Sequence, residues 1–215
     1  MNLNNVTLVS MTSVELNRTI KALEYSYKDI NFKSVKLITD QNISHPEIEV
    51  CNINKMSNID EYSYNMIYKL SDYIDTDHAL IIQSDGFIIN KNSWMEEFYN
   101  YDYIGAPFPL PNDNFSYRDK MGNIFRVGNG GFSFRSKKLI DLANKLNLEW
   151  KPFHGFYNED GFICAMNRHI YEENGCVFAP LEIAKYFSHE SNIPEIIGIE
   201  PFGFHGKYSK YINLI

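Results

Sequence analysis

Four short groups of polar residues in this chain have types and spacings that could do chemistry. They are Gln83-Ser84-Asp85, Asn129-Gly130-Gly131, Glu159-Asp160 and Phe204-His205-Gly206. Carboxylate and imidazole groups can hold a divalent cation, and a carboxylate can also take a proton from a hydroxyl. Paired glycines let the backbone come close to a ligand. The question is whether the fold brings these groups together.

The stretch around Asp85 allows two interpretations. Residues 79–90 read ALIIQSDGFIIN, and an Asp-Gly pair between apolar runs is typical of a two-residue β-hairpin turn. The run 79–82, however, is apolar at every position, which is typical of a strand buried on both faces of a parallel sheet, where ligands bind at the carboxyl ends. In that case Gln83 and Asp85 offer oxygens to a cation. A turn at a strand tip can carry such a ligand, so the two interpretations are compatible.

The other groups also have simpler explanations. Asn129-Gly130-Gly131 could be a tight turn that needs a positive φ. Glu159-Asp160 could be acids at a helix start, where the helix dipole favours them. His205 could be an ordinary loop histidine.

Composition excludes several classes of protein. The 215 residues suffice for one α/β domain, with 44% hydrophobic and 22% charged residues. A net charge of -7 without a Lys/Arg run argues against nucleic acid or an anionic membrane surface as partner. We expect no signal peptide and no membrane span. The three cysteines are widely spaced, which argues against a zinc or disulfide framework and favours a cytoplasmic location.

Periodicity predicts the elements that would position these groups. The expected strands cover residues 6–10, 34–39, 48–51 and 79–82, and the expected helices begin with a capping box at 12–15, at 62 and at 137. Their order predicts an α/β domain with a mostly parallel central sheet flanked by helices. The proline-rich region 107–126 is expected to be a long loop that acts as a lid or binds an acceptor. A last helix is expected to begin at Glu159-Asp160.

Common catalytic signatures are missing from the sequence. It contains neither a GxGxxG nor a GxxxxGK[ST] loop, and HExxH does not occur. The segment Gly131 to Arg135 departs from a serine nucleophile elbow because arginine replaces the final glycine. Hydride transfer, P-loop hydrolysis and zinc proteolysis are therefore not favoured.

The order of these features resembles the GT-A fold nucleotide-sugar glycosyltransferases. The features are an acidic strand tip, a glycine-rich loop, a Glu-Asp pair opening a helix and a late histidine. The chain looks closest to small glycosyltransferase-like domains that carry YDYIGAP, here 101–107, and VGNGGFS, here 127–133. It is also similar to glycogenin-like enzymes in the Lys69-Leu70 pair. The resemblance implies a single GT-A (Rossmann-like) domain over 1–215, with a nucleotide-binding half at 1–100 and an acceptor-binding half at 101–215.

The resemblance also implies roles for individual residues. Asp85 and His205 would bind Mn²⁺ or Mg²⁺, and Asp160 would be the catalytic base, with Glu159 holding substrate hydroxyls. Phe156 and Tyr157 would contact the acceptor. The donor-binding residues would be Thr12, Asp40, Lys69, Gln83, Ser84, Asn129, Gly130 and Gly131.

The implied activity is metal-assisted transfer of a sugar, from a donor expected to be UDP-linked, to a glycan or glycolipid acceptor in surface polysaccharide or glycoconjugate synthesis. A carboxylate base implies inversion at the anomeric carbon, although glycogenin-like relatives retain configuration. The sequence departs from the family where Gln83 replaces the first aspartate of Asp-x-Asp. A non-catalytic nucleotide- or glycan-binding module therefore stays open as an alternative. Sugar nucleotidyl transfer is less favoured, because residues 10–13 lack glycine.

Overall fold

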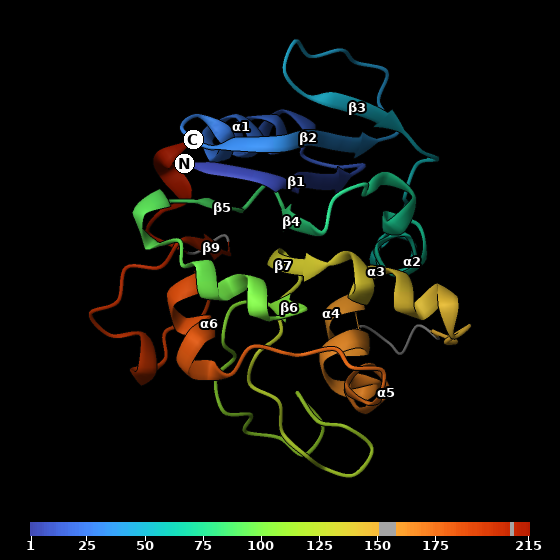
Figure 1. Cartoon of the computed structure of the whole chain (residues 1–215), viewed down its shortest axis with the longest axis vertical. Coiled ribbons are helices and arrows are strands. Elements are labelled where there is room, and N and C mark those ends of the chain that lie inside the picture. Colours follow the sequence, from blue (N-terminus) through green and yellow to red (C-terminus); the bar gives the residue numbers. More distant parts are fainter. Residues whose placement is uncertain (151–157, 207–208) are drawn as a thin grey trace.

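A six-stranded mixed sheet forms the centre of the molecule (Figure 1). A computed structural model describes residues 1–150, 158–206 and 209–215. The sheet has the order β3-β2-β1-β4-β7-β6. Its strands are β1 (Asn2–Thr12), β2 (Asn31–Thr39), β3 (Glu49–Asn52), β4 (His78–Ile82), β6 (Tyr103–Ile104) and β7 (Phe132–Ser136).

The strand directions confirm the predicted α/β class. Strands β2 and β4 pair in parallel with β1, and β3 pairs in parallel with β2. Strand β7 runs antiparallel to both β4 and β6. Because β7 comes from the second half of the chain and pairs with β4 from the first, one sheet joins the two halves.

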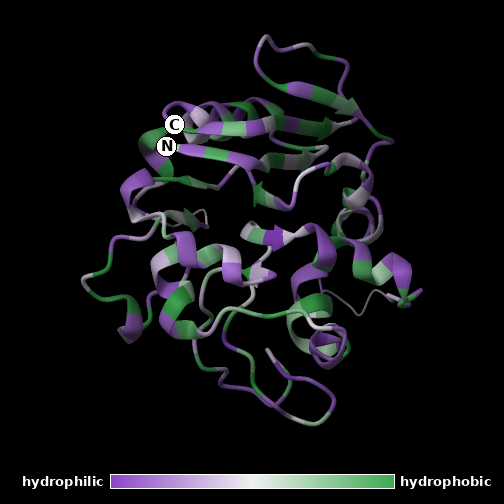
Figure 2. Cartoon of the chain, viewed as in Figure 1, coloured by the Kyte–Doolittle hydropathy of each residue, from purple (hydrophilic) through white to green (hydrophobic). Residues whose placement is uncertain are grey.

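Strands β1 and β4 are buried on both faces, because alternate side chains of a strand point to opposite sides. Val6 and Leu8 join a core under α1 (Leu16–Tyr27), whereas Val9 and Met11 join a core with α2 (Ile59–Tyr68) and α3 (Lys137–Lys145). Strand β4 divides in the same way. In Figure 2, β4 is largely in the hydrophobic colour, whereas the start of β1 is hydrophilic. The predicted two-faced burial of residues 79–82 is confirmed.

A second, three-stranded sheet places residues 203–205 beside β5, the strand that follows the turn after β4. It has the order β5-β9-β8, with β5 (Gly86–Ile88), β9 (Gly203–His205) and β8 (Ser188–His189). Gly86 pairs with His205 in this sheet. The Asp-Gly turn exists, because the Gly86 N–H donates to the Gln83 carbonyl at 3.1 Å. It does not form an ordinary hairpin, since β4 and β5 belong to different sheets.

The start of α1 corrects the predicted capping box. Glu15 is the residue before the helix, with a left-handed φ of 48°, and no side chain caps the helix. The polar groups of this segment are used in tertiary contacts: the Ser13 hydroxyl accepts from the Met56 N–H, and the Glu15 carboxylate accepts from the Ser84 hydroxyl.

The last part of the chain holds more helix than predicted. A short α4 (Glu159–Gly161) begins at the predicted place and continues as a π-helical turn, Phe162–Met166, and as α5 (Arg168–Glu173). The expectation that this is the last helix is wrong, because α6 (Leu181–Phe187) follows. Helix α6 buries only Ala184 and Phe187, and two positions are too few for a helical period to stand out.

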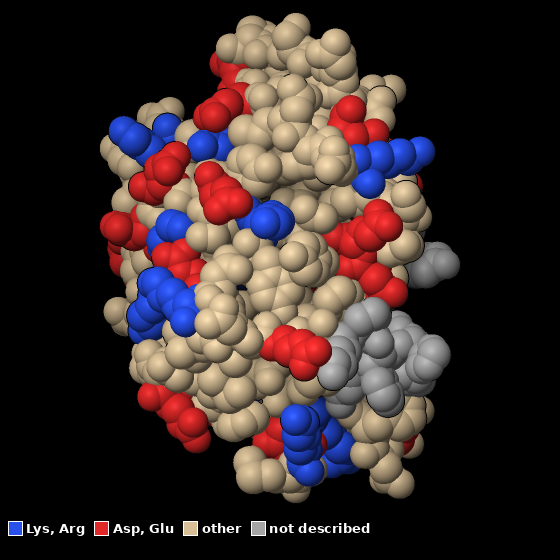
Figure 3. Space-filling view, turned by 90° about the vertical axis from the view of Figure 1, so that its right-hand side faces the viewer, with Lys and Arg blue, Asp and Glu red and all other residues tan. Residues whose placement is uncertain are grey.

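Charges of both signs occur in small groups on the face that Figure 3 shows, and neither sign covers it. Among the described residues, no helix is both long and apolar enough to cross a membrane.

Burial of β1 predicts that two leucines differ strongly in how much their truncation destabilises the protein. Leu8 is fully buried and Leu110 is 67% exposed. Leu8→Ala should lower the free energy of unfolding by about 2 to 5 kcal/mol, because the cavity it leaves cannot collapse between two packed layers. Leu110→Ala should change it by less than about 0.5 kcal/mol. Urea denaturation measures both, and equal effects would contradict the two-faced core.

Candidate functional site

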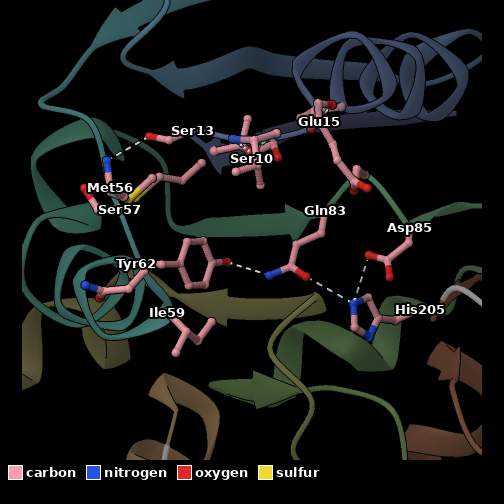
Figure 4. Close-up of a pocket in the computed structure, with 16 residues that line it drawn as sticks. Ser10, Ser13, Glu15, Met56, Ser57, Ile59, Tyr62, Gln83, Asp85 and His205 are labelled. Atoms are coloured by element: carbon pink, nitrogen blue, oxygen red, sulfur yellow. Dashed lines mark hydrogen bonds and ion pairs between the residues drawn. The ribbon is translucent and has the colours of Figure 1, made fainter. Parts of the chain in front are cut away.

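A cavity of about 450 Å³ opens at the carboxyl ends of β1 and β4. Its walls come from the β1–α1 connection, the start of α2 with the residues before it, and the turn after β4 (Figure 4). The described lining residues are Ser10, Met11, Thr12, Ser13, Val14, Glu15, Thr19, Met56, Ser57, Asn58, Ile59, Tyr62, Gln83, Ser84, Asp85 and His205. The cavity therefore contains three polar groups singled out from the sequence, at residues 12, 83–85 and 205.

His205 connects the two ends of the chain at the cavity wall. Its Nε2 lies 3.1 Å from Gln83 Oε1 and 3.3 Å from Asp85 Oδ1 (Figure 4). On the other side of the ring, Nδ1 lies 3.2 Å from Glu190 Oε1. Residues 83 and 205 meet because β9 pairs with β5 directly after the turn.

The surroundings of His205 favour its charged form. Burial lowers the pKa of the imidazole, but hydrogen bonds to Asp85 and Glu190 outweigh this and raise that pKa from 6.5 to about 9. In its charged form the ring donates from Nε2 to Asp85 and from Nδ1 to Glu190, and Nδ1 also lies 3.1 Å from Asn129 Nδ2. A cation held by Nε2 would take the place of the proton there.

Gln83 is oriented from both ends of its side-chain amide. Its Nε2 donates to the Tyr62 hydroxyl at 2.8 Å, which leaves Oε1 directed at His205. Oxygens of Gln83 and Asp85 thus both lie within 3.3 Å of the His205 Nε2. Glu190 fixes the histidine ring from behind, as carboxylates do for metal-ligating histidines.

This donor set fits a hard divalent cation that takes its remaining ligands from substrate oxygens and water. The described part of the chain contains no group of three or more His, Cys, Asp or Glu side chains that could hold a metal by itself. Binding of a cation would therefore depend on the substrate.

The segment Asn129-Gly130-Gly131 lies against both Asp160 and His205. The Gly130 N–H donates to Asp160 Oδ2 at 3.1 Å. A Cβ added at Gly131 would lie 2.1 Å from His205 Nε2. The left-handed φ of this segment, 51°, belongs to Asn129, and neither glycine has a positive φ. The glycines are thus required by close approach and not by the turn.

The Glu-Asp pair divides into two different environments. Glu159 is 3% exposed, and its carboxylate accepts from the fully enclosed Arg135 at 3.3 Å. Asp160 instead lines a second cavity, and its Oδ1 accepts from the Gly161 N–H at 2.7 Å. Contact of Glu159 with a substrate hydroxyl stays a prediction, because Arg135 occupies its carboxylate in this structure.

The remaining predicted residues are distributed unevenly. Thr12 and Ser84 line the cavity. Asp40 follows β2 at the same edge but is not part of the lining, and its buried Oδ1 finds no hydrogen-bond partner in the described residues. Lys69 is exposed at the end of α2, whereas the start of α2 reaches the cavity. Phe156 and Tyr157 lie outside the described residues.

Sequence reasoning missed three residues of the site: Glu15, Tyr62 and Glu190. Tyr62 occupies a helix position that looks like ordinary core, and Glu190 follows a two-residue strand without any motif. Glu15 looked like a capping residue. Only its left-handed backbone marks it as unusual, and strained residues cluster at functional sites.

A family model matches most of this chain. Residues 46–205 match the family described as "Protein of unknown function (DUF5672)", a span that contains Asp85, Gly131, Asp160 and His205. A search of curated proteins finds no match.

Two solved structures are similar over nearly the whole chain. One is a glycosyltransferase involved in the glycosylation of the major capsid of PBCV-1, with a TM-score of 0.56, 12% identity, and coverage of 98% of this chain and 99% of that one. The other is an active-site mutant of LgtC, with a TM-score of 0.52, 12% identity, and coverage of 93% and 86%. At this identity the likeness concerns the fold, and it confirms the expected GT-A-like fold.

The close approach at Gly131 can be tested by a double-mutant cycle. Gly131→Ala should lower the free energy of unfolding by about 1 to 3 kcal/mol, because the added methyl group must push the His205 ring aside. In a His205→Ala background most of this cost should vanish. Equal costs in both backgrounds, measured by urea denaturation, would show that the two residues do not touch.

The buried Glu159 predicts a pH dependence of stability. Burial and the charge of Asp160 raise the pKa of Glu159 from 4.5 to about 7, against the opposing effect of Arg135. The folded protein therefore keeps a proton that the unfolded chain releases, so stability should fall as pH rises from about 4.5 to about 7.

Glu159→Gln should flatten the profile of unfolding free energy against pH, and the partly exposed Glu172→Gln controls for the loss of one carboxylate. An unchanged slope in Glu159→Gln would contradict the assignment.

Proposed function

We propose that this chain, which belongs to the family described as "Protein of unknown function (DUF5672)", transfers a sugar from a nucleotide-sugar donor to a glycan hydroxyl. One observation carries the proposal. Asp85, His205 and Gln83 converge at the mouth of a cavity, and the segment Gly130-Gly131 links them to Asp160. The GT-A-like fold supports this assignment.

The charge of the cavity supports a metal-assisted reaction. Its described lining contains the carboxylates of Glu15 and Asp85 but neither lysine nor arginine. Asp85 and Glu190 already balance the charge of His205, so a diphosphate placed there would be repelled unless a further counter-charge came with it. Asp85, His205 and Gln83 would hold a divalent cation, and the nitrogen ligand favours Mn²⁺ slightly over Mg²⁺. When bound, this cation would stabilise the negative charge of the leaving diphosphate.

The cavity also suits the nucleoside part of a donor. Met56, Ile59 and Tyr62 provide apolar surface, and the Thr12 and Ser84 hydroxyls and the Glu15 carboxylate provide hydrogen-bonding groups. We assign the donor to UDP-linked sugars because of the similarity to GT-A glycosyltransferases. Asp40 and Lys69 lie outside this cavity, so a role for either in donor binding requires a change of shape.

Asp160 is proposed to activate the acceptor. The acceptor oxygen attacks the anomeric carbon, the bond from that carbon to the diphosphate oxygen breaks, and its electron pair leaves with the diphosphate. The proton of the acceptor hydroxyl passes to the Asp160 carboxylate. Hydrogen bonds from the Gly130 and Gly161 N–H groups hold this carboxylate in place.

The proposed stereochemical outcome is inversion. Gly130 contacts Asp160 and the next residue, Gly131, contacts His205. A sugar ring lying over these two glycines would have the base on one side and the diphosphate on the other. The physiological setting proposed is surface polysaccharide or glycoconjugate synthesis in the cytoplasm.

Nucleotide binding tests the donor site. We expect UDP to bind in the presence of Mn²⁺ and to bind at least about tenfold more weakly with chelator or in Asp85→Ala, because the diphosphate then lacks the counter-charge that a bound cation supplies. Isothermal titration with UDP and GDP measures this. Asp75→Ala is the matched control, since Asp75 is exposed and precedes β4, at the opposite end of the strand from Asp85. An affinity for UDP that is unchanged both by chelator and by Asp85→Ala would refute the metal-assisted site.

The rate of UDP release tests the role of Asp160 as the base. Release of UDP from a panel of UDP-sugars should fall by about 10² to 10⁴ in Asp160→Asn, while Mn²⁺-dependent UDP binding stays as in the native protein. Glu172→Gln serves as the surface control. Binding of nucleotide without any sugar transfer or UDP release from native protein would instead identify a non-catalytic binding module.

A further inference from the structure

A second cavity of about 190 Å³ lies beside the proposed base. It is formed between the connection from β6 to β7, which extends below the sheet in Figure 1, and α4 with the π-helical turn that follows it. Its described lining residues are Phe108, Phe115, Ser116, Tyr117, Phe125, Asn158, Asp160, Gly161, Cys164 and Ala165. Four aromatic side chains thus share a cavity with the carboxylate that the proposed reaction uses.

The loop holds these aromatic rings by its own backbone pairing. The Phe108 N–H donates to the Arg126 carbonyl at 2.7 Å, and the Phe125 N–H donates to the Tyr117 carbonyl at 2.8 Å. The rings of Phe108 and Tyr117 are stacked, with centroids 4.1 Å apart and planes 7° apart. Arg168 lies 4.5 Å over the ring of Phe125 and fixes it from the helix side.

Tyr117 is held in an unusual conformation. Its φ is 55°, a left-handed value that is uncommon for an aromatic residue. Such a backbone persists only where the surrounding contacts determine it, and it is found most often at binding sites. Here it allows the Tyr117 ring to stack on Phe108 at the edge of the cavity.

The same tyrosine connects this cavity to the proposed donor site. A wider groove is lined by Tyr117 together with Asp85 and His205, so the aromatic cavity and the metal-binding group open onto one continuous surface. A ligand in the aromatic cavity would therefore contact Asp160, and Tyr117 borders both this cavity and the groove that reaches Asp85 and His205.

The chemistry of the walls limits the class of ligand. A purely apolar group would displace water from Asp160 without replacing its hydrogen bonds, which is unfavourable. The ligand must therefore present apolar surface to the rings and a hydroxyl to the carboxylate. A cavity of this size is also smaller than the roughly 300 to 1,000 Å³ of sites for drug-sized molecules, which favours a single ring.

We infer that this cavity is the acceptor subsite and that it takes one pyranose ring of a glycan. One C–H face of the sugar lies against the aromatic rings, and a sugar hydroxyl donates to Asp160. The assignment of this cavity as an acceptor site rests on the proposed function. Binding of a sugar to it can be measured independently of that function.

Saturation-transfer NMR tests the inference, with the methyl pyranosides of glucose, galactose, mannose and N-acetylglucosamine as probes. At least one of them should receive saturation, most strongly on the protons of one ring face. Tyr117→Ala and Phe115→Ala should each weaken binding of that sugar by about five- to tenfold, because a stacking surface is lost. Leu110→Ala, a change at an exposed residue of the same loop that does not line the cavity, should leave binding unchanged.

If Tyr117→Ala does not fold, Phe115→Ala decides alone, since Phe115 is 51% exposed and its loss is tolerable. No saturation of any of the four sugars, or undiminished binding in the folded variants, would overturn the inference. Titration of UDP with Mn²⁺ on the same proteins separates the two proposals. Sugar binding without nucleotide binding would support the subsite and contradict the proposed transferase activity. Nucleotide binding without sugar binding would contradict only the subsite.

Discussion

Burial of β1 and β4 on both faces is the constraint on which the rest of the structure depends. Apolar side chains alternate between two cores along these strands, so exposed polar groups can gather only where the strands end. Because β1 and β4 are parallel neighbours, their carboxyl ends meet at one edge of the sheet. The cavity forms there, and the polar residues at the two strand ends, Thr12 and Gln83, become part of its walls.

The return of the chain end to this edge completes the site. Pairing of Gly86 with His205 brings an imidazole from the last part of the chain against Asp85. This approach leaves no room for a side chain at Gly131, whose place for a Cβ is taken by the histidine ring. The glycine-rich segment and His205 are therefore packed directly against each other, and the histidine ring is the reason that residue 131 must be glycine.

Neighbouring polar residues serve different purposes in this molecule. Glu159 is paired with Arg135 in the interior, and Arg135 also lies 5.1 Å over the ring of Tyr103, whose hydroxyl donates to the Asn129 carbonyl. This buried network supports the glycine-rich segment from below. Asp160, one residue later, lines an open cavity instead. Backbone N–H groups of Gly130 and Gly161 hold the Asp160 carboxylate, and the buried network supports Gly130. The carboxylate is therefore well placed for proton transfer, because no other mobile side chain is needed to hold it.

The sequence by itself determined the α/β class and the acidic strand tip, because two-faced burial leaves consecutive apolar residues and Asp85 follows closely after them. It could not determine the contacts of Glu15, Tyr62 or Glu190, since local patterns report helical or strand period and turn chemistry and nothing about distant partners. Gln83 and His205 are 122 positions apart and meet only through a second sheet of short strands. The tertiary structure alone decided that Glu159 is buried against Arg135 and Asp160 is not, because two adjacent residues on a helical turn face different directions.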